Sequence, residues 1–194
     1  MGWPVGHELE SPLWLSEDAR ERSFEEGKVQ NLRLACAAIN GVVLESGDVF
    51  SFWKQVGRAS RSRGFVVGRM LQQGCIIPAV GGGLCQLSNA LYGLALMSRC
   101  EIVERHAHSV KMPGASIHDA TVAWNYVDLR FRVRQRTRIE ATMSERALTV
   151  GFRFHAAVED GLSPLPGIET MEHTASAQSC SSCGEVSCFR HESR

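Results

Sequence analysis

Three consecutive glycines at residues 81–83 are followed by Leu84 and then by Cys85, and this feature constrains the fold more than any other. Glycine permits positive φ angles and lets other groups approach the backbone closely. Leucines at spacings of three and four residues from Leu84 to Leu94 predict a helix that opens at Cys85. The first turn of a helix carries unpaired N–H groups and a partial positive charge. A thiol placed there should ionise more readily and become a better nucleophile.

The expected helix has a polar face and an apolar face. The polar face holds four residues at spacings of three and four, which are Cys85, Ser88, Asn89 and Tyr92. The N–H groups of the first turn could hold an oxyanion, and the side chain of Gln86 could be a further donor. Two simpler interpretations stay open, because free cysteine is commonly a small buried residue and a glycine run is commonly a turn. Cys85 is a candidate nucleophile only if a histidine can reach it.

Length and charge limit the class of protein. The chain has 194 residues, enough for one domain and a short appendage. Lys and Arg together number 21, as do Asp and Glu, so the net charge gives no reason to expect nucleic-acid or membrane binding. No apolar run approaches the roughly 20 residues that cross a bilayer. The first ten residues lack the pattern of a secretory signal, so we expect a cytoplasmic protein, whose seven cysteines are thiols or metal ligands rather than disulfides.

Changes in composition divide the chain into four parts. They are an N-terminal arm (1–22), an α+β domain (23–156), a linker (157–176) and a Cys/His-rich tail (177–194). Helical spacing predicts a helix over 24–40, and alternating apolar residues over 139–154 predict an antiparallel hairpin. We therefore expect an α+β fold, with a mainly antiparallel sheet, a nucleophile-bearing helix packed on it and a short Cys-rich C-terminal tail.

Two histidines follow the expected helix. Residues 101–110 are predicted to form a strand that returns alongside the helix. Because successive side chains of a strand alternate, His106 and His108 would share one face. Either imidazole could then reach Cys85, and only its distance from the sulfur can choose between them. The neighbouring Arg105 either pairs with an acidic residue or binds a substrate carboxylate.

Motifs along residues 31–154 resemble the VanW family, which is named for an accessory protein of glycopeptide-resistance operons. They are AING at 38–41, GDVFSF at 47–52, VG at 56–57, GGGLCQLSN at 81–89, VER at 103–105, His108-Ser109, DAT at 119–121 and Asp128. Several motifs in the same order make the resemblance specific. Leu-Ser-Asn follows Cys85-Gln86. At this position the sequence resembles members of the short, signal-less branch of the family, to which the resistance-operon protein belongs.

The resemblance implies a chemistry for these motifs. Some surface-anchored members of the family are implicated as peptidoglycan L,D-transpeptidases, with the cysteine of the glycine motif as nucleophile. Carried over, Cys85 would be the nucleophile, His108 the general base and Asp119 the residue that orients the base. Asp128 is the alternative for that last role. The oxyanion or substrate-binding positions are expected at Gly82, Gly83, Gln86, Asn89, Arg105 and His106.

The resemblance also implies a peptide or muropeptide-like substrate, and no cofactor for the Cys85 chemistry. Wall cross-linking takes place outside the membrane, whereas this chain shows no export signal, so a soluble precursor or another peptide would suit a cytoplasmic enzyme. A second hypothesis is a non-catalytic accessory module that holds a peptide or glycopeptide in the same place. The two hypotheses differ in whether Cys85 is reactive.

The tail carries ligand types at the spacing C-x2-C-x4-C-x2-H. The predicted ligands are Cys180, Cys183, Cys188 and His191. Three thiolates and an imidazole complete a tetrahedral zinc site, and bound metal would order a segment that is too short to build a core. An iron–sulfur cluster and an unliganded, oxidisable tail are the alternatives. The VanW resemblance does not extend to this segment.

Overall fold

Four antiparallel strands form the main sheet, in the order β1-β9-β8-β2. The residues described by this computed structural model are 3, 5–14, 21–72, 75–108 and 117–154. The strands of the main sheet are β1 (Val5–Pro12), β2 (Val43–Leu44), β8 (Thr137–Met143) and β9 (Ala147–Phe154). In β9 the alternate residues Leu148, Val150 and Phe152 are all buried, as expected when one face of a strand lies on a core.

A smaller sheet and a hairpin complete the β structure of the described residues. The smaller sheet has the order β3-β7-β6, and β4 pairs with β5. Their bounds are β3 (Val49–Ser51), β4 (Val67–Gln72), β5 (Cys75–Val80), β6 (Glu101–Glu104) and β7 (Arg130–Arg132). The rings of Phe50 and Phe131 stack across β3 and β7 with centroids 4.7 Å apart. Phe131 also contacts Phe152 of β9 at 5.5 Å, and this contact joins the two sheets.

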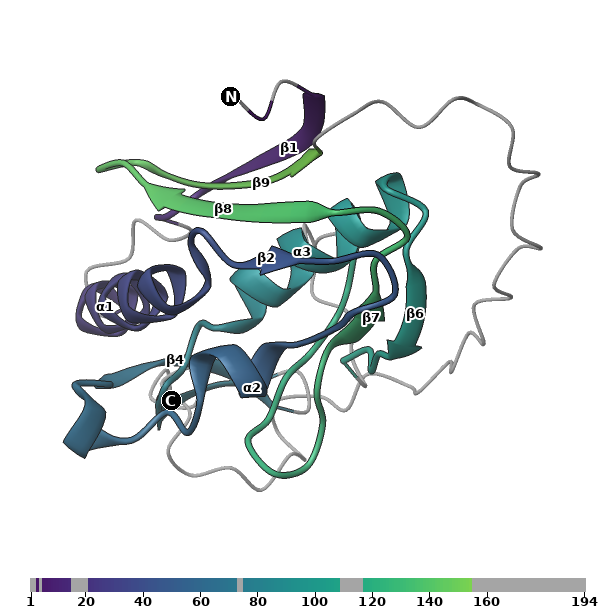
Figure 1. The fold of residues 1–194 in the computed structure, drawn as a ribbon. Coiled ribbons are helices and arrows are strands. Elements are labelled where there is room, and N and C mark those ends of the chain that lie inside the picture. Colours follow the sequence, from purple (N-terminus) through teal and green to yellow (C-terminus); the bar gives the residue numbers. More distant parts are fainter. Residues whose placement is uncertain (1–2, 4, 15–20, 73–74, 109–116, 155–194) are drawn as a thin grey trace.

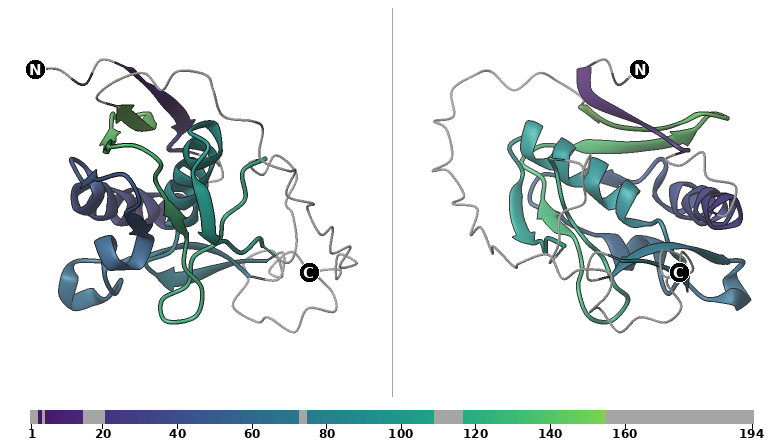
Figure 2. Two further views of the ribbon diagram at one scale, coloured as in Figure 1. Left: turned by 45° about the vertical axis from the view of Figure 1, so that its right-hand side comes forward. Right: turned by 180° about the vertical axis from the view of Figure 1, so that it is seen from behind.

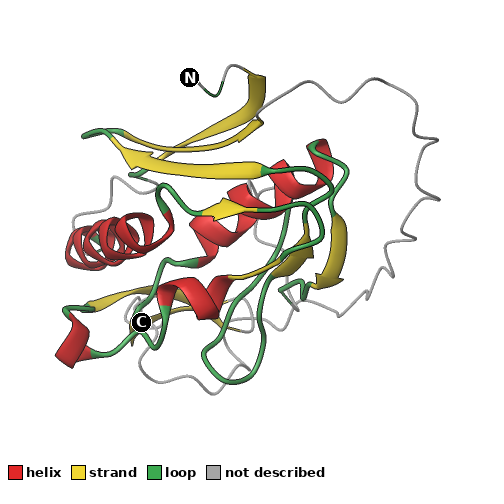
Figure 3. Ribbon diagram, viewed as in Figure 1, coloured by secondary structure: helices red, strands yellow, loops and turns green. Residues whose placement is uncertain are grey.

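The helices of the described residues lie below the main sheet. They are α1 (Arg22–Ile39), α2 (Phe52–Val56), α3 (Cys85–Met97) and the short 3-10 helix η1 (Arg61–Arg63). Helix α1 contacts both β8 and β4, so it lies between the main sheet and the β4–β5 hairpin (Figure 1). Helix α3 contacts β1 and β9, and the view from behind shows it under those strands (Figure 2). Figure 3 shows the same layering by element type, with both long helices beneath the strands of the main sheet.

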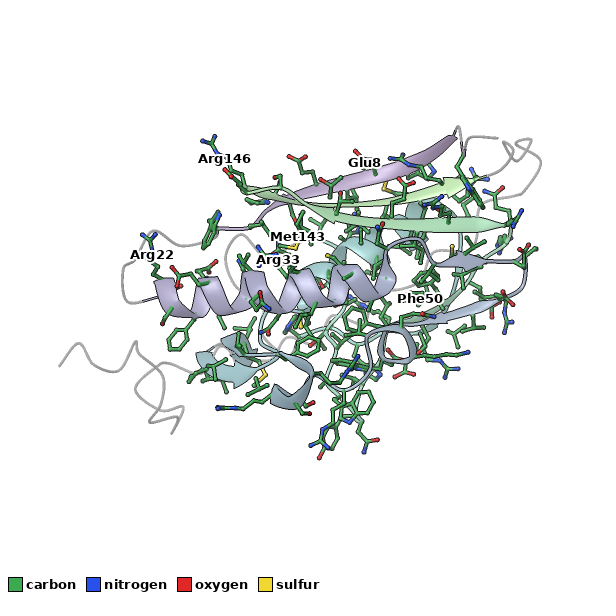
Figure 4. All side chains as sticks on the ribbon, turned by 60° about the vertical axis from the view of Figure 1, so that its left-hand side comes forward. Glu8, Arg22, Arg33, Phe50, Met143 and Arg146 are labelled. Atoms are coloured by element: carbon green, nitrogen blue, oxygen red, sulfur yellow. The ribbon has the colours of Figure 1, made fainter. Side chains whose placement is uncertain are left out.

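The core forms where the two long helices meet the sheets. Its fully buried leucines and isoleucine on these helices are Leu32, Ile39, Leu87, Leu91 and Leu94. Phe50 lies within the molecule, whereas Arg22 and Arg146 extend from its surface (Figure 4). Each buried leucine or phenylalanine contributes about 1.5–3 kcal/mol relative to an exposed one. The leucine face of α3 therefore anchors the helix and turns its polar face toward the candidate site.

The class predicted from the sequence is confirmed, and so are the helix that begins at Cys85 and the hairpin within 139–154. The predicted strand over 101–110 is wrong for residues 105–108, because β6 ends at Glu104, and residues 109–110 lie outside the described part of the chain. Its partner β7 is only three residues long, and the register shifts between Ile102 and Glu104, so the ladder stops there. His106 forms only an isolated bridge with Thr121.

The predicted N-terminal arm contributes β1, which pairs with β9 along its whole length as an edge strand of the main sheet. The predicted linker and Cys/His-rich tail (157–194) lie outside the described residues.

Candidate active site

The glycine run forms a turn that delivers Cys85 to the N-terminus of α3. Gly81 and Gly83 have φ angles of 78° and 98°, in the left-handed region that glycine adopts without strain. The N–H of Gln86 donates to the Gly83 carbonyl at 3.2 Å, which starts the helix. Leu84 is buried and fixes the turn to the core, while Cys85 is only half-buried. The sulfur therefore sits at the boundary of the core, at a helix N-terminus.

Three groups around the Cys85 thiol favour its ionised form. Burial raises the pKa of this thiol, but hydrogen bonding from the His108 side chain, together with other donors, outweighs burial, and the pKa is lowered. The other donors are the backbone N–H of Val122 and the hydroxyl of Thr121. Oγ1 of Thr121 lies 3.6 Å from the sulfur. The surroundings of Cys85 thus stabilise a thiolate.

In two other cysteines, Cys36 and Cys100, the pKa of the thiol is raised instead of lowered. Cys36 on α1 and Cys100 after α3 are both buried. Burial raises the pKa of each thiol to about 12, with a nearby arginine only partly opposing this for Cys100. Of Cys36, Cys85 and Cys100, the cysteines whose side chains the structure describes, Cys85 is the one whose surroundings favour the thiolate that a nucleophile needs.

Asp119 orients the imidazole of His108. Its Oδ1 lies 2.6 Å from Nδ1 of the ring, and its Oδ2 accepts the backbone N–H of His108 at 2.9 Å. The hydrogen bond with Asp119, followed by that with Cys85, raises the pKa of His108 to about 10 against the effect of burial. Burial disfavours the charge on Asp119, but its hydrogen bonds with His108 outweigh this and lower the pKa of the carboxyl. At neutral pH His108 is therefore an imidazolium and Asp119 a carboxylate, and the hydrogen bond and charge of the imidazolium favour the ionised form of Cys85.

The polar face of α3 positions the segment that carries Asp119 and Thr121. The hydroxyl of Ser88 donates to the Ala120 carbonyl at 2.5 Å, and Oδ1 of Asn89 accepts the Ala120 N–H at 2.8 Å. Both backbone polar groups of Ala120 are thus held by the helix that carries Cys85. The residues on either side of Ala120 are thereby fixed next to the sulfur and the imidazole.

A family model described as VanW like protein matches residues 27–153, which is more than half of the 194-residue chain. The chain belongs to this VanW-like family. Cys85, His108 and Asp119 all lie within the match, so the whole arrangement around the thiol is in the VanW-like part of the chain. Strand β1 precedes it.

The chain is similar to parts of longer proteins. It is 31% identical over 131 residues to the vancomycin B-type resistance protein VanW of Enterococcus faecalis (strain ATCC 700802 / V583), a match that covers 64% of the chain and 48% of that protein. It is 32% identical over 111 residues to the uncharacterized protein YoaR of Bacillus subtilis (strain 168), which covers 57% of the chain and 37% of that protein. The matched region is thus less than half the length of either relative. The name of the enterococcal protein links one member of the family to vancomycin resistance. No solved structure matches the chain significantly.

Two of the residues predicted to bind an oxyanion or substrate, Gln86 and Gly82, form hydrogen bonds within the protein. Nε2 of Gln86 donates to the Ser11 hydroxyl at 2.9 Å and the Pro12 carbonyl at 2.8 Å, so its amide group holds the end of β1. The carbonyl of Gly82 accepts from Nδ2 of Asn31 at 2.9 Å. In this structure these groups are engaged in contacts within the protein, and their predicted binding roles stay predictions.

The structure separates the two histidines that the sequence placed together. The ring of His106 is half-exposed, and its Nε2 lies 3.4 Å from a carboxylate oxygen of Glu104. The histidine that forms a hydrogen bond with the Cys85 thiol is His108. Nε of Arg105 donates to the Asp119 carbonyl at 2.7 Å, and its guanidinium lies 5.1 Å from the centre of the Tyr92 ring. Arg105 therefore supports the backbone of Asp119, whose carboxylate is bonded to the ring of His108.

Asp128, the alternative partner of the histidine, has a different role. It accepts the hydroxyl of Ser51 at 2.5 Å and the N–H groups of Trp53 at 3.1 Å and Leu129 at 2.9 Å. These contacts fix the start of α2. The geometry therefore selects Asp119 as the partner of the imidazole.

Thr121, Val122 and Ser88 contribute to the site, but the sequence assigned them no role in it, although Ser88 was placed on the polar face of the helix and Thr121 in a family motif. A usable signal was present for Thr121, because alternate residues of an extended segment point the same way and Asp119 lies two positions before it. The role of Val122 uses its backbone N–H, which no side-chain pattern reveals.

The predicted metal ligands Cys180, Cys183, Cys188 and His191 lie outside the described residues, so zinc binding by the tail stays a prediction. Within the described part of the chain, no group of three or more His, Cys, Asp or Glu residues is arranged to hold a metal ion. None of the helices in the described residues has the length and apolar character needed to cross a membrane.

Proposed function

We propose that the protein is a cysteine-dependent acyltransferase or amidase that acts on peptidoglycan-type peptides through a thioester on Cys85. One observation carries the proposal: Nδ1 of His108 is 2.6 Å from Asp119 while the same ring interacts with the thiol. A nucleophile, a base and a residue that orients the base are the set that nucleophilic catalysis requires. The motifs shared with the VanW family support the same assignment.

The first half of the reaction starts from the ion pair. Because the pKa of Cys85 is lowered and that of His108 is raised to about 10, neutral pH favours thiolate and imidazolium. The sulfur forms a bond to the peptide carbonyl carbon, and the C=O π electrons move to oxygen. When the C–N bond breaks, the imidazolium gives its Nε2 proton to the leaving amine. The products are an acyl thioester on Cys85 and a neutral imidazole.

The second half regenerates the enzyme. An acceptor amine or a water molecule attacks the thioester carbon, and Nε2 of His108 takes the proton that it loses. The C–S bond breaks with its electron pair returning to sulfur, which restores the thiolate–imidazolium pair. An amine acceptor gives transpeptidation and water gives amide hydrolysis, so both activities use the same residues.

The start of α3 supplies the donors for the oxyanion in this mechanism. An acyl group on the Cys85 sulfur places its oxygen next to the first helical turn, where the N–H groups of Leu87 and Ser88 donate to the Leu84 carbonyl. The N–H of Gln86 already donates to Gly83, so the assigned donor is the N–H of Cys85 itself. The helix dipole adds a partial positive charge there, and one such donor contributes about 10²–10³ to kcat in other hydrolases.

Support for the substrate class comes from the family. The resemblance implicates surface-anchored members as L,D-transpeptidases, and the enterococcal relative is named for vancomycin resistance. We therefore assign a peptidoglycan-type peptide as acyl donor, either in the wall or as a free precursor.

Intact-mass spectrometry of the protein after incubation with muropeptides tests the proposal. The wild type should gain the mass of an acyl fragment, located at Cys85 by peptide mapping. Cys85→Ala should gain none while melting at the same temperature, and His106→Ala, which removes a half-exposed ring, should behave as the wild type. If the wild type binds the peptides but forms no adduct and releases no product, the protein is a peptide- or glycopeptide-binding accessory module and the catalytic proposal fails.

A further inference from the structure

Asn31 lies on α1 behind the glycine turn and is fully buried. Its Nδ2 donates to the carbonyls of Val66 at 3.0 Å and Gly82 at 2.9 Å, and its Oδ1 accepts the Val66 N–H at 2.9 Å. The Val66 carbonyl also accepts the N–H of Gly81 at 3.0 Å. The amide of Asn31 thus pairs with Val66 as a neighbouring strand would. At the same time it holds the glycine turn directly through Gly82.

The glycine turn is packed closely against α1 and β4. A Cβ on Gly82 would lie 2.4 Å from the Gly68 carbonyl oxygen, and one on Gly83 would lie 2.1 Å from Cγ of Lys28. Lys28 is itself fully buried, with Nζ 2.7 Å from a carboxylate oxygen of Glu25. The position of the turn is therefore set from the α1 side, by contacts that do not include the thiol.

Ionisation of the thiol depends on other segments. The groups that lower the pKa of Cys85 belong to His108, Thr121 and Val122. Asn31 contacts the carbonyl three positions before the nucleophile and none of these groups. The direction of the N–H groups at the start of α3 and the charge state of the sulfur are thus controlled by separate parts of the molecule.

We propose that Asn31 is a positioning residue, which fixes the glycine turn so that the N–H of Cys85, at the start of α3, meets the oxyanion formed when Cys85 is acylated. The inference rests on the proposed function. Glycine backbone has the widest conformational freedom, so a turn of three glycines needs an external anchor to present the same geometry each time. A displacement of about 1 Å at a reacting centre can lower the rate by about a hundredfold.

Two reactions of the same sulfur separate this role from general stabilisation. Iodoacetamide alkylates the thiolate by displacing iodide at a saturated carbon, and no oxyanion forms. p-Nitrophenyl acetate acylates it through an oxyanion and releases p-nitrophenolate, which is followed by absorbance. For Asn31→Ala we expect the acylation rate to fall about tenfold or more, with the alkylation rate and its pH dependence unchanged.

A matched control is Asn40→Ala. Asn40 is the C-cap residue of α1, and its Oδ1 accepts the Ala141 N–H at 3.1 Å. The Asn40→Ala variant should therefore have a lower melting temperature and unchanged rates of acylation and alkylation. Asn31→Asp is a second, isosteric variant in case Asn31→Ala does not fold. It keeps the acceptor for the Val66 N–H, but its ionised form sets an oxygen against the carbonyls of Val66 and Gly82. Its acylation rate should therefore fall as this carboxyl ionises, while alkylation follows the wild-type profile.

The outcomes distinguish the inference from the function on which it rests. Equal slowing of acylation and alkylation in folded Asn31 variants would overturn the positioning role and leave Cys85 as the nucleophile. Full retention of the acylation rate would overturn it too. A wild-type protein that is alkylated but never acylated would remove the proposed function, and the positioning role with it.

Discussion

His108 is bound to Asp119 twice, through its ring and through its own backbone N–H. The first bond fixes which ring nitrogen carries the proton toward the carboxylate, and the second fixes where the chain runs. Together they leave Nε2 for the thiol of Cys85. This bidentate contact is the feature on which the proposed chemistry depends, and it gives several measurable consequences.

Replacing His108 by alanine should slow alkylation of Cys85 at neutral pH. Burial acts to raise the pKa of this thiol, and the His108 hydrogen bond is the first of the effects that lower it. Without the imidazole the pKa should rise, and each unit lowers the thiolate fraction by about tenfold. The pH dependence of the iodoacetamide reaction measures this pKa. His106→Ala is the control and should leave it unchanged; an equally low pKa in His108→Ala would contradict the assignment.

Replacing Asp119 by asparagine should lower the pKa of His108 from about 10, because the carboxylate is the first cause of its elevation. The alkaline limb of the acylation profile should then move to lower pH, and an NMR titration of the ring would report the same shift. Asp128→Asn is the matched control. It weakens the start of α2, so it should lower the melting temperature without changing the His108 titration. A His108 titration unchanged in Asp119→Asn would count against the pairing.

The free energy of unfolding should vary with pH through the same pair. The folded pKa of His108, about 10, exceeds the ordinary 6.5, so its contribution is complete below 6.5 and is lost as pH rises through 10. Asp119 has a lowered pKa, so its contribution is present above the ordinary 3.8 and is lost as pH falls through the folded value. Urea titrations should show the largest difference between wild type and His108→Gln between pH 3.8 and 6.5. A difference that persists undiminished above pH 10 would rule out the raised pKa.

Glu25 should be important for stability, because it is 1% exposed and pairs with both Lys28 and Arg69. Glu25→Gln leaves the buried ammonium of Lys28 without its counter-ion, which should lower the free energy of unfolding by about 3–5 kcal/mol. Glu26→Gln is the control, since its pair with Arg22 is exposed and should contribute at most about 0.5 kcal/mol. Urea midpoints of the two variants check this, and equal midpoints would show that the buried pair adds nothing.

The Cys/His-rich tail makes a prediction about metal content. The 194-residue protein should purify with about one zinc per chain, since three thiolates and one imidazole fill a tetrahedral site. Cys183→Ser should lose the metal, whereas Ser182→Ala, a substitution between ligands, should keep it. Plasma mass spectrometry after gentle purification measures both. Wild-type protein that contains neither zinc nor iron would exclude a stable site.

The fold was predictable from the sequence wherever burial of one face of an element gives its apolar residues a regular spacing. Leu87, Leu91 and Leu94 are spaced for a helix face, and each is fully buried in α3. The strand predicted over 101–110 is shorter in the structure, where β6 ends at Glu104. The alternating pattern of the sequence continues beyond that residue, but the partner strand β7 is only three residues long. The end of a strand depends on a neighbour far along the chain, which a local pattern does not contain.

The candidate site was predictable as a set of residues but not as a geometry. His108 and Asp119 are 11 positions apart, and family motifs rather than spacing pointed to them. Asn31 gave no such signal, because asparagine within a helix pattern usually faces solvent. Its bonds to Val66 and Gly82 span 35 and 51 positions, so only the folded chain reveals them.

Strand β1 pairs with β9 from Val5 opposite Phe154 to Pro12 opposite Ala147, and its end is bound by Gln86, the residue after Cys85. All of β1 precedes residue 27, where the family match begins. A fragment trimmed to that boundary would leave one edge of β9 open to pairing with other molecules. It would also release the side-chain amide of Gln86 from its bonds with Ser11 and Pro12. If such a fragment were inactive, the cause would be the loss of β1 and not the absence of the residues around Cys85.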